Sequence, residues 1–122
     1  LANLTGSDWS HAQIKMADFR LANLQNAHME GINFELCQFD ALEAESSVWH
    51  AASLHSCDFS HANLSSSNWR GAKLSHCILH DIKEQNVDWS PCTLHQTVKT
   101  DMSRLRAEQF KPGSPAQEGG AS

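Results

Sequence analysis

The chain lacks several features that would point to a known class of activity. No apolar run approaches the roughly 18 residues that a membrane-spanning helix needs. Nine lysine and arginine residues against fourteen acidic ones give a net charge of −5, too few and too scattered for nucleic-acid binding. No phosphate-cradling glycine loop, His-Glu-x-x-His or nucleophile elbow is present. We therefore predict no enzyme activity, cofactor, metal, membrane or nucleic-acid partner.

A period of five residues is present instead. Of the 19 third positions from Leu4 to Leu94, 17 are large and apolar, and of the 19 first positions from Ala2 to Cys92, 15 are Ala, Cys or Ser. This period fits neither the 3.6 residues of a helical turn nor the alternation of a strand. It therefore predicts a solenoid that turns once in a whole number of five-residue units.

The units Ala-Asn-Leu at 2–4, 22–24 and 62–64, Ala-Asp-Phe at 17–19 and Cys-Asp-Phe at 57–59 resemble the pentapeptide-repeat family. The resemblance covers roughly 95 of the 122 residues. It implies an all-β fold, a right-handed quadrilateral parallel β-helix. Each coil would hold four pentapeptides, so that the chain forms a solenoid of nearly five coils.

The large residues support a 20-residue coil independently, because like residues recur every 20 positions. One column holds all four tryptophans and a methionine, and another holds three phenylalanines and a leucine: Trp9, Met29, Trp49, Trp69 and Trp89; Phe19, Phe39, Phe59 and Leu79. Stacked coils would bury these columns as the structural core.

The pattern ends after Val98, which sets the predicted domain boundaries. Residues 1–98 form the β-helix, and 99–110 form a capping segment with a short helix from Met102 to Phe110. In that helix Thr100 or Asp101 is the N-cap, and Met102, Leu105 and Phe110 lie on the last coil. Residues 111–122 form a disordered tail. No cover is visible for the N-terminal coil, so this coil would face solvent, another domain or a second molecule, and end-to-end self-association through it is one interpretation.

All four cysteines occupy the small first position of a unit: Cys37, Cys57, Cys77 and Cys92. A disulfide or metal site is one interpretation, but no Cys-x-x-Cys zinc spacing occurs. Buried reduced thiols are favoured, because Ala and Ser fill the same position elsewhere. They indicate a cytoplasmic location. The chain also begins inside a repeat without a leader, so we expect a fragment whose targeting segment is missing, and secretion into a host cell stays open.

Two polar features touch the predicted core. Trp9, Trp49 and Trp69 each follow a first-position serine by two residues, so these hydroxyls are expected to accept the indole N–H groups. The alternative is that serine is simply small, and Trp89, which follows Val87, favours it. Glu84 occupies a core position, and a locally distorted backbone is expected to let it reach water.

An acidic ring is the candidate interaction surface, formed by Glu30, Glu35, Asp40, Glu43 and Glu45. Lys15 beneath Glu35 and Arg20 beneath Asp40 are expected to form vertical ion pairs. One hypothesis is that the ring binds a basic partner. The other is that it is a solvated face that resists aggregation.

Eight histidines are expected to point outward. His55, His76 and His95 are close enough in register for a weak transition-metal site or a pH-sensitive patch, although polar surface residues are the simpler interpretation.

The predicted function is a protein–protein interaction or rigid spacer module in a larger bacterial protein. Family members that resemble the chain occur as such segments, including secreted effectors. The alternative that the resemblance implies is a DNA mimic that inhibits or protects DNA gyrase or topoisomerase IV. Fewer than five coils and a net charge of −5 weigh against it. A noncatalytic substrate-recognition domain of a larger enzyme, such as a bacterial ubiquitin ligase, is a third possibility.

Overall fold

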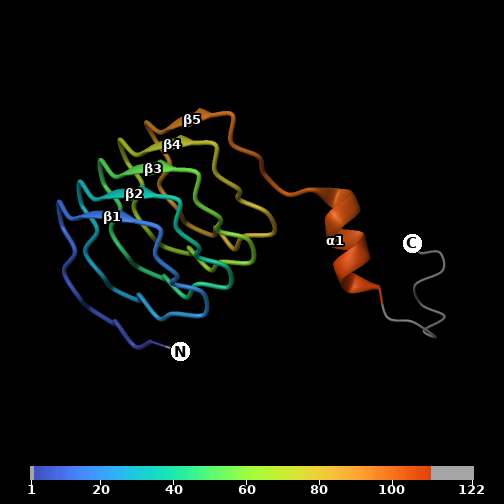
Figure 1. Cartoon of the computed structure of the whole chain (residues 1–122), viewed down its shortest axis with the longest axis horizontal. Coiled ribbons are helices and arrows are strands. Elements are labelled where there is room, and N and C mark those ends of the chain that lie inside the picture. Colours follow the sequence, from blue (N-terminus) through green and yellow to red (C-terminus); the bar gives the residue numbers. More distant parts are fainter. Residues whose placement is uncertain (1, 111–122) are drawn as a thin grey trace.

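The protein is a parallel β-solenoid with one short C-terminal helix, described by a computed structural model over residues 2–110. One strand from each coil joins a five-stranded parallel sheet in chain order: β1 (Gln13–Lys15), β2 (Asn33–Glu35), β3 (Ser53–His55), β4 (Lys73–Ser75) and β5 (Thr93–His95). Each strand pairs with the next at an offset of 20 residues, as Ile14 does with Phe34. Single bridges at the same offset join the other sides, the last between Ile78 and Val98. The four-sided coil predicted from the sequence is confirmed (Figure 1).

The corners of the coil depend on the fifth position of each unit. There the backbone adopts the left-handed region, with φ between 47° and 74°, at fifteen residues other than glycine and at Gly6, Gly31 and Gly71. This conformation costs an ordinary residue roughly 1–2 kcal/mol. The ladder between coils offsets that cost, because these residues donate their N–H groups to the next coil, as Leu21 does to Asp40 and His61 to His80.

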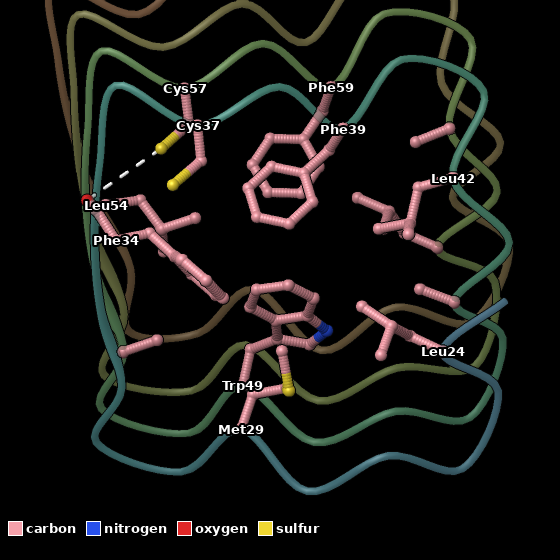
Figure 2. Packing of buried hydrophobic residues seen from close by; sticks show 14 of the residues in the cluster. Leu24, Met29, Phe34, Cys37, Phe39, Leu42, Trp49, Leu54, Cys57 and Phe59 are labelled. Atoms are coloured by element: carbon pink, nitrogen blue, oxygen red, sulfur yellow. Dashed lines mark hydrogen bonds between the residues drawn. The ribbon is translucent and has the colours of Figure 1, made fainter. Parts of the chain in front are cut away.

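The predicted columns stack as expected and are buried in the middle coils, whereas Trp9, Phe19 and Trp89 at the two ends are only partly buried. Trp49 lies over Trp69 with ring centroids 4.5 Å apart and planes at 5°, and Phe39 lies over Phe59 at 4.6 Å and 6°. Figure 2 looks along the solenoid and shows the rings of Trp49, Phe39 and Phe59 pointing into the square cross-section. At the C-terminal end the stack loosens, because Trp89 lies 5.3 Å from Trp69 with planes at 30°. Dense stacking is therefore a property of the middle coils, which have neighbours on both sides.

The serine hypothesis is confirmed. The indole N–H groups of Trp9, Trp49 and Trp69 donate to the hydroxyls two residues earlier, at 2.6, 2.6 and 2.9 Å. Each hydroxyl in turn donates to a main-chain carbonyl three residues before it, as Ser47 does to Ala44 at 2.6 Å. Every buried indole thus has a partner that is itself satisfied.

Trp89 uses Glu84 in place of the missing serine. The carboxylate of Glu84 accepts the indole N–H at 3.0 Å. The coil is not distorted there, because the regular bridges Asn63–Lys83 and Asn68–Asp88 flank it. Glu84 is exposed because it lies in the last coil. The expected local distortion is wrong, although the expected access to water is confirmed.

All four cysteines are free thiols, and Cys37, Cys57 and Cys77 are buried in one column. Their sulfurs contact carbonyls of the previous coil, as Cys57 does with Phe34 at 3.8 Å, the dashed line in Figure 2. A hydrogen bond with Cys77, and then burial, raise the pKa of the Cys57 thiol. Cys37, Cys57 and Cys77 serve as small core residues, as the simpler interpretation holds, whereas Cys92 in the last coil is only half-buried, so the predicted burial is wrong for it.

The N-terminal coil is only partly buried at Leu4, Trp9, Ile14 and Phe19. The expected end-to-end contact through this coil stays a prediction.

Helix α1 (Met102–Gln109) forms where the sequence predicted a helix, and the side chain of Asp101 accepts the N–H of Arg104 as its N-cap. It does not cover the last coil. Met102 and Phe110 are 56% and 53% exposed, no residue of α1 is buried, and Leu94 of β5 is 41% exposed. The helix instead lies beside the stack (Figure 1). The expected packing of Met102, Leu105 and Phe110 on the last coil is therefore wrong, and the tail predicted for 111–122 lies outside the described residues.

Candidate functional site

The predicted acidic ring goes around the solenoid and does not form one face. Successive fourth positions lie on successive sides of the coil, so the carboxylates of the ring point away from one another. Glu35 pairs with Lys15 at 3.6 Å, which confirms one of the two expected vertical pairs. Glu43 is exposed. Because the ring is spread over four sides, a flat partner can contact only part of it.

The second expected pair is wrong. Arg20 holds Asp18 with two charge-assisted hydrogen bonds of 2.9 and 2.7 Å, and it attracts Asp40 from a distance without a hydrogen bond or ion pair to it. This guanidinium lowers the pKa of Asp18 to about 2. Burial, with Asp58 nearby, raises the pKa of Asp40. Arg20 pairs with Asp18, two residues away in the chain, in preference to Asp40 in the next coil, because the nearer pair costs less side-chain entropy.

The other two carboxylates of the ring are held by polar neighbours. Glu45 accepts from the amides of Gln25 and Asn63 at 3.2 and 3.0 Å. Glu30 accepts from the hydroxyl of Ser10 at 3.2 Å, and a hydrogen bond from its own backbone N–H lowers its pKa. Both side chains link neighbouring coils. Whether the ring also binds a partner stays a prediction.

A second polar region lies where α1 meets the solenoid. We call it the helix seat and define it as Ser60, His61, His80 and Asp81. The 20-residue register places His80 beside Ser60 and Asp81 beside His61 in adjacent coils. Ser60 and His80 are fully buried, unlike exposed Arg20 and half-buried Asp40 in the same column. The expectation that all histidines point to solvent is therefore wrong for His80.

Polar contacts hold α1 on the helix seat. Arg104 donates to the hydroxyl of Ser60 at 3.2 Å, and Glu108 lies 2.8 Å from Nε2 of His80 and 3.2 Å from Nε2 of His61. Arg104 and Glu108 also pair with each other at 2.8 Å, one helical turn apart. The hydrogen bond with His80, and then that with Arg104, lower the pKa of Glu108 to about 2.

The hydrogen-bond partners of His80 assign its protonation. The backbone N–H of Asp101 donates to Nδ1 at 3.0 Å, so Nδ1 carries no hydrogen. The ring is then neutral with its hydrogen on Nε2, and it donates to Glu108. His80 thereby joins the N-terminus of α1 to its last turn.

His61 has the opposite environment. Its Nδ1 faces Asp81 at 3.1 Å and its Nε2 faces Glu108 at 3.2 Å, so both nitrogens meet carboxylate oxygens. A ring with hydrogens on both nitrogens donates to both, whereas a neutral ring turns one lone pair toward an anion. The helix seat therefore combines one histidine that accepts a main-chain N–H and one whose two ring nitrogens both meet carboxylates, with ring centroids 5.3 Å apart.

Comparison with known proteins agrees with this geometry. The model of the family described as pentapeptide repeats matches eight copies at residues 1–35, 17–42 and 52–83, which is more than half of the chain. The chain belongs to the pentapeptide-repeat family. No curated protein matches it.

Two solved structures of pentapeptide-repeat architecture show the same fold. Trypsin-treated QnrB1 (R167E), a plasmid-mediated fluoroquinolone resistance protein, aligns with a TM-score of 0.68 at 20% identity, over 79% of this chain and 52% of that one. A pentapeptide repeat protein from the thylakoid lumen of Arabidopsis thaliana aligns with a TM-score of 0.65 at 21% identity, over 85% and 72%. This chain thus spans about half of the QnrB1 structure, and at these identities the likeness concerns the fold alone.

The helix seat also gathers groups that a pentapeptide-repeat solenoid could in principle use for a metal. Ligand atoms of His61, His80 and Glu108 lie within 4.8 Å of one another. A cation at Nε2 of His80 would need the hydrogen there to move to Nδ1, where it would face the N–H of Asp101. The network therefore favours hydrogen bonding over metal binding. Ser60 donates to Asp58 at 2.6 Å, and both ring nitrogens of His80 are engaged by Glu108 and the N–H of Asp101, so this arrangement does not direct His80 at the hydroxyl of Ser60 as a base.

The histidines singled out from the sequence form a looser group in this pentapeptide-repeat fold. The rings of His55 and His76 are 5.3 Å apart and those of His76 and His95 are 5.8 Å apart, all exposed and edge to face. Sequence reasoning missed the helix seat, whose only signal was a run of different polar residues at positions 60, 61, 80 and 81. Within residues 2–110, no helix has the length and apolar character required to cross a bilayer.

Proposed function

We propose that this pentapeptide-repeat chain is a non-enzymatic module that binds protein or holds other domains apart, as a rigid part of a larger bacterial protein such as a secreted effector. The observation that carries the proposal is the docking of α1. A side wall of the solenoid holds a helix through the side chains of Ser60, His61 and His80, and no residue of that helix is fully buried. The same wall can therefore recognise a polypeptide through polar contacts.

The remainder of the described surface supports the same function. Two open hollows lie on the described surface, one of about 420 Å³ lined by Asp18, Arg20, Leu21, Asp40 and Ala41, and one of about 280 Å³ along β1 and β2. Neither brings together a nucleophile, a base and an oxyanion donor, as a hydrolytic site requires. The large apolar residues are used for stacking, which suits a rod whose specificity lies on its surface.

A topoisomerase assay separates this function from DNA mimicry. We expect the purified chain, added to DNA gyrase at micromolar concentration, to leave supercoiling unchanged, because its acidic ring is spread around four sides. In parallel, the full chain and its Ser60→Ala/His80→Gln variant are used as baits in affinity capture. Proteins retained by the native wall and lost from the variant support an interaction module, whereas inhibition of supercoiling would contradict the proposal.

A further inference from the structure

The helix seat is the C-terminal half of a longer track along one corner of the solenoid. Two adjacent columns run along this corner, and we call their eight residues the corner track: Arg20 and Leu21, Asp40 and Ala41, Ser60 and His61, His80 and Asp81. Helix α1 contacts the last two pairs. The first two pairs line the hollow of about 420 Å³, where Leu21 is 57% exposed.

We infer that the corner track binds a helix of a partner protein, and that α1 is a resident stand-in that this helix displaces. The inference rests on the proposed function and names the partner by its chemistry. The partner helix carries an arginine and, one turn later, a glutamate over the helix seat, and it extends further than α1 to place an apolar side chain over Leu21 and Ala41.

The contacts of α1 show which chemistry the helix seat recognises. The imidazole of His80 accepts an N–H from a helix start and donates to a glutamate. The hydroxyl of Ser60 accepts from an arginine while Asp58 receives its hydrogen. His61, backed by Asp81, meets the same glutamate. A helix must supply all three groups at the right spacing, which gives the track selectivity for sequence.

Two observations indicate that α1 can be displaced. Eight residues are too few for a helix that is stable by itself, so α1 depends on its contacts with the track. The contacts between α1 and the track are polar, no residue of α1 is fully buried, Leu105 is half-buried, and Met102 and Phe110 are 56% and 53% exposed. A partner that keeps the polar contacts and also covers Leu21 gains apolar burial that α1 does not have.

The hollow also has complementary charge for such a helix. Asp40 is half-buried, and burial and the nearby Asp58 raise its pKa, although its own backbone N–H, Arg20 and then Arg104 of α1 partly oppose this effect. A basic residue of a longer helix, placed near Asp40, would relieve it more fully.

Peptide binding to full-length variants tests the inference. The first probe is a fluorescein-labelled peptide of residues 99–110, and the second extends it by one turn that carries a leucine. The first protein is Arg104→Ala/Glu108→Ala, which frees the track and leaves the core columns intact. The second adds Ser60→Ala/His80→Gln to it. Tryptophan fluorescence and thermal unfolding check that all variants fold.

We expect the 99–110 peptide to bind the freed protein at least tenfold more tightly than the native chain, because the tethered α1 competes at high effective concentration. Binding should be lost when Ser60 and His80 are also replaced, and with a control peptide whose arginine and glutamate are exchanged. The extended peptide should bind more tightly still, and Leu21→Ser should remove only that gain.

Three outcomes would overturn the inference: equal binding to native and freed protein, binding that survives the loss of Ser60 and His80, or a gain from the extension that Leu21→Ser leaves unchanged. A concentration-dependent dimer of the native chain that Arg104→Ala/Glu108→Ala cannot form would assign the track to a second copy's α1 and also overturn it. Gyrase inhibition with intact peptide binding would instead refute only the proposed function.

Discussion

The interior of the solenoid and its corner track share one register but use it in opposite ways. Inside, positions 20 apart carry the same kind of residue, as Trp49 over Trp69 and Phe39 over Phe59 show. On the corner track the same offset joins Arg20, Asp40, Ser60 and His80, no two of them alike. The comparison indicates that stacking requires similar neighbours for close packing, whereas recognition requires a sequence of different groups at fixed spacing.

The largest contrast should come from truncating a ring in the middle of the stack. Trp49→Ala removes a fully buried indole that contacts coils on both sides, and it should lower the free energy of unfolding by about 3–5 kcal/mol. His80→Gln in the helix seat should loosen α1 and leave the core columns in place. Urea unfolding followed by far-ultraviolet circular dichroism compares the two, and a similar loss for both would remove the distinction.

A smaller loss of stability is expected when a buried indole stays in place but its N–H loses the serine hydroxyl that accepts it. Ser47→Ala leaves the N–H of Trp49 without an acceptor in a closed core, which should cost about 1–3 kcal/mol. The matched control is Ser7→Ala, because Trp9 is partly exposed and water can replace the hydroxyl. Chemical denaturation of both variants measures the difference. Equal losses would show that the serines matter for size alone.

The helix seat should respond to acid at a pH where the core does not. The pKa of Glu108 is lowered to about 2 by hydrogen bonds with His80 and Arg104, from an ordinary value of 4.5. Its contribution to docking is therefore complete above about pH 4.5 and is lost as the pH falls toward 2.

Glu108→Gln tests this pH dependence. The melting temperature of the native chain should exceed that of the variant at pH 5, and the gap should close by pH 2. A gap of constant size would show that the charge of Glu108 does not matter for docking.

The smallest effect on stability is expected at the N-terminal end of the corner track. Arg20→Ala removes an exposed pair with Asp18, which should change the free energy of unfolding only slightly because solvent screens such a pair. Moderate salt should reduce the difference further. A clearly larger loss in urea unfolding would show that Arg20 supports the fold and is not free to contact a partner.

The periodic part of the molecule could be predicted because each coil repeats the same packing problem. The columns of tryptophan and phenylalanine, the small cysteines and the serine partners of Trp9, Trp49 and Trp69 all follow from residues spaced 20 or 2 apart. Two pairings did not follow. Arg20 pairs with Asp18, which is nearer in the chain than Asp40. The indole N–H of Trp89 donates to Glu84, because Val87 has no hydroxyl to accept it.

The position of α1 could not be predicted from its residues. Asp101 marked its start, yet Met102, Leu105 and Phe110 wrongly indicated an apolar contact with the last coil. The contacts that place it join residues 28 to 47 positions apart through single polar groups, as between His80 and Glu108 or His61 and Glu108. Such contacts leave no period in the sequence.

By itself, the sequence determined a four-sided coil, since a repeated small–polar–large unit can bury its large residues only by stacking on copies of itself. Only the tertiary structure decided which surface residues contact α1, because the repeat gives the solenoid several similar corners on which a helix can dock. It settles where its arginine and glutamate find Ser60, His61 and His80.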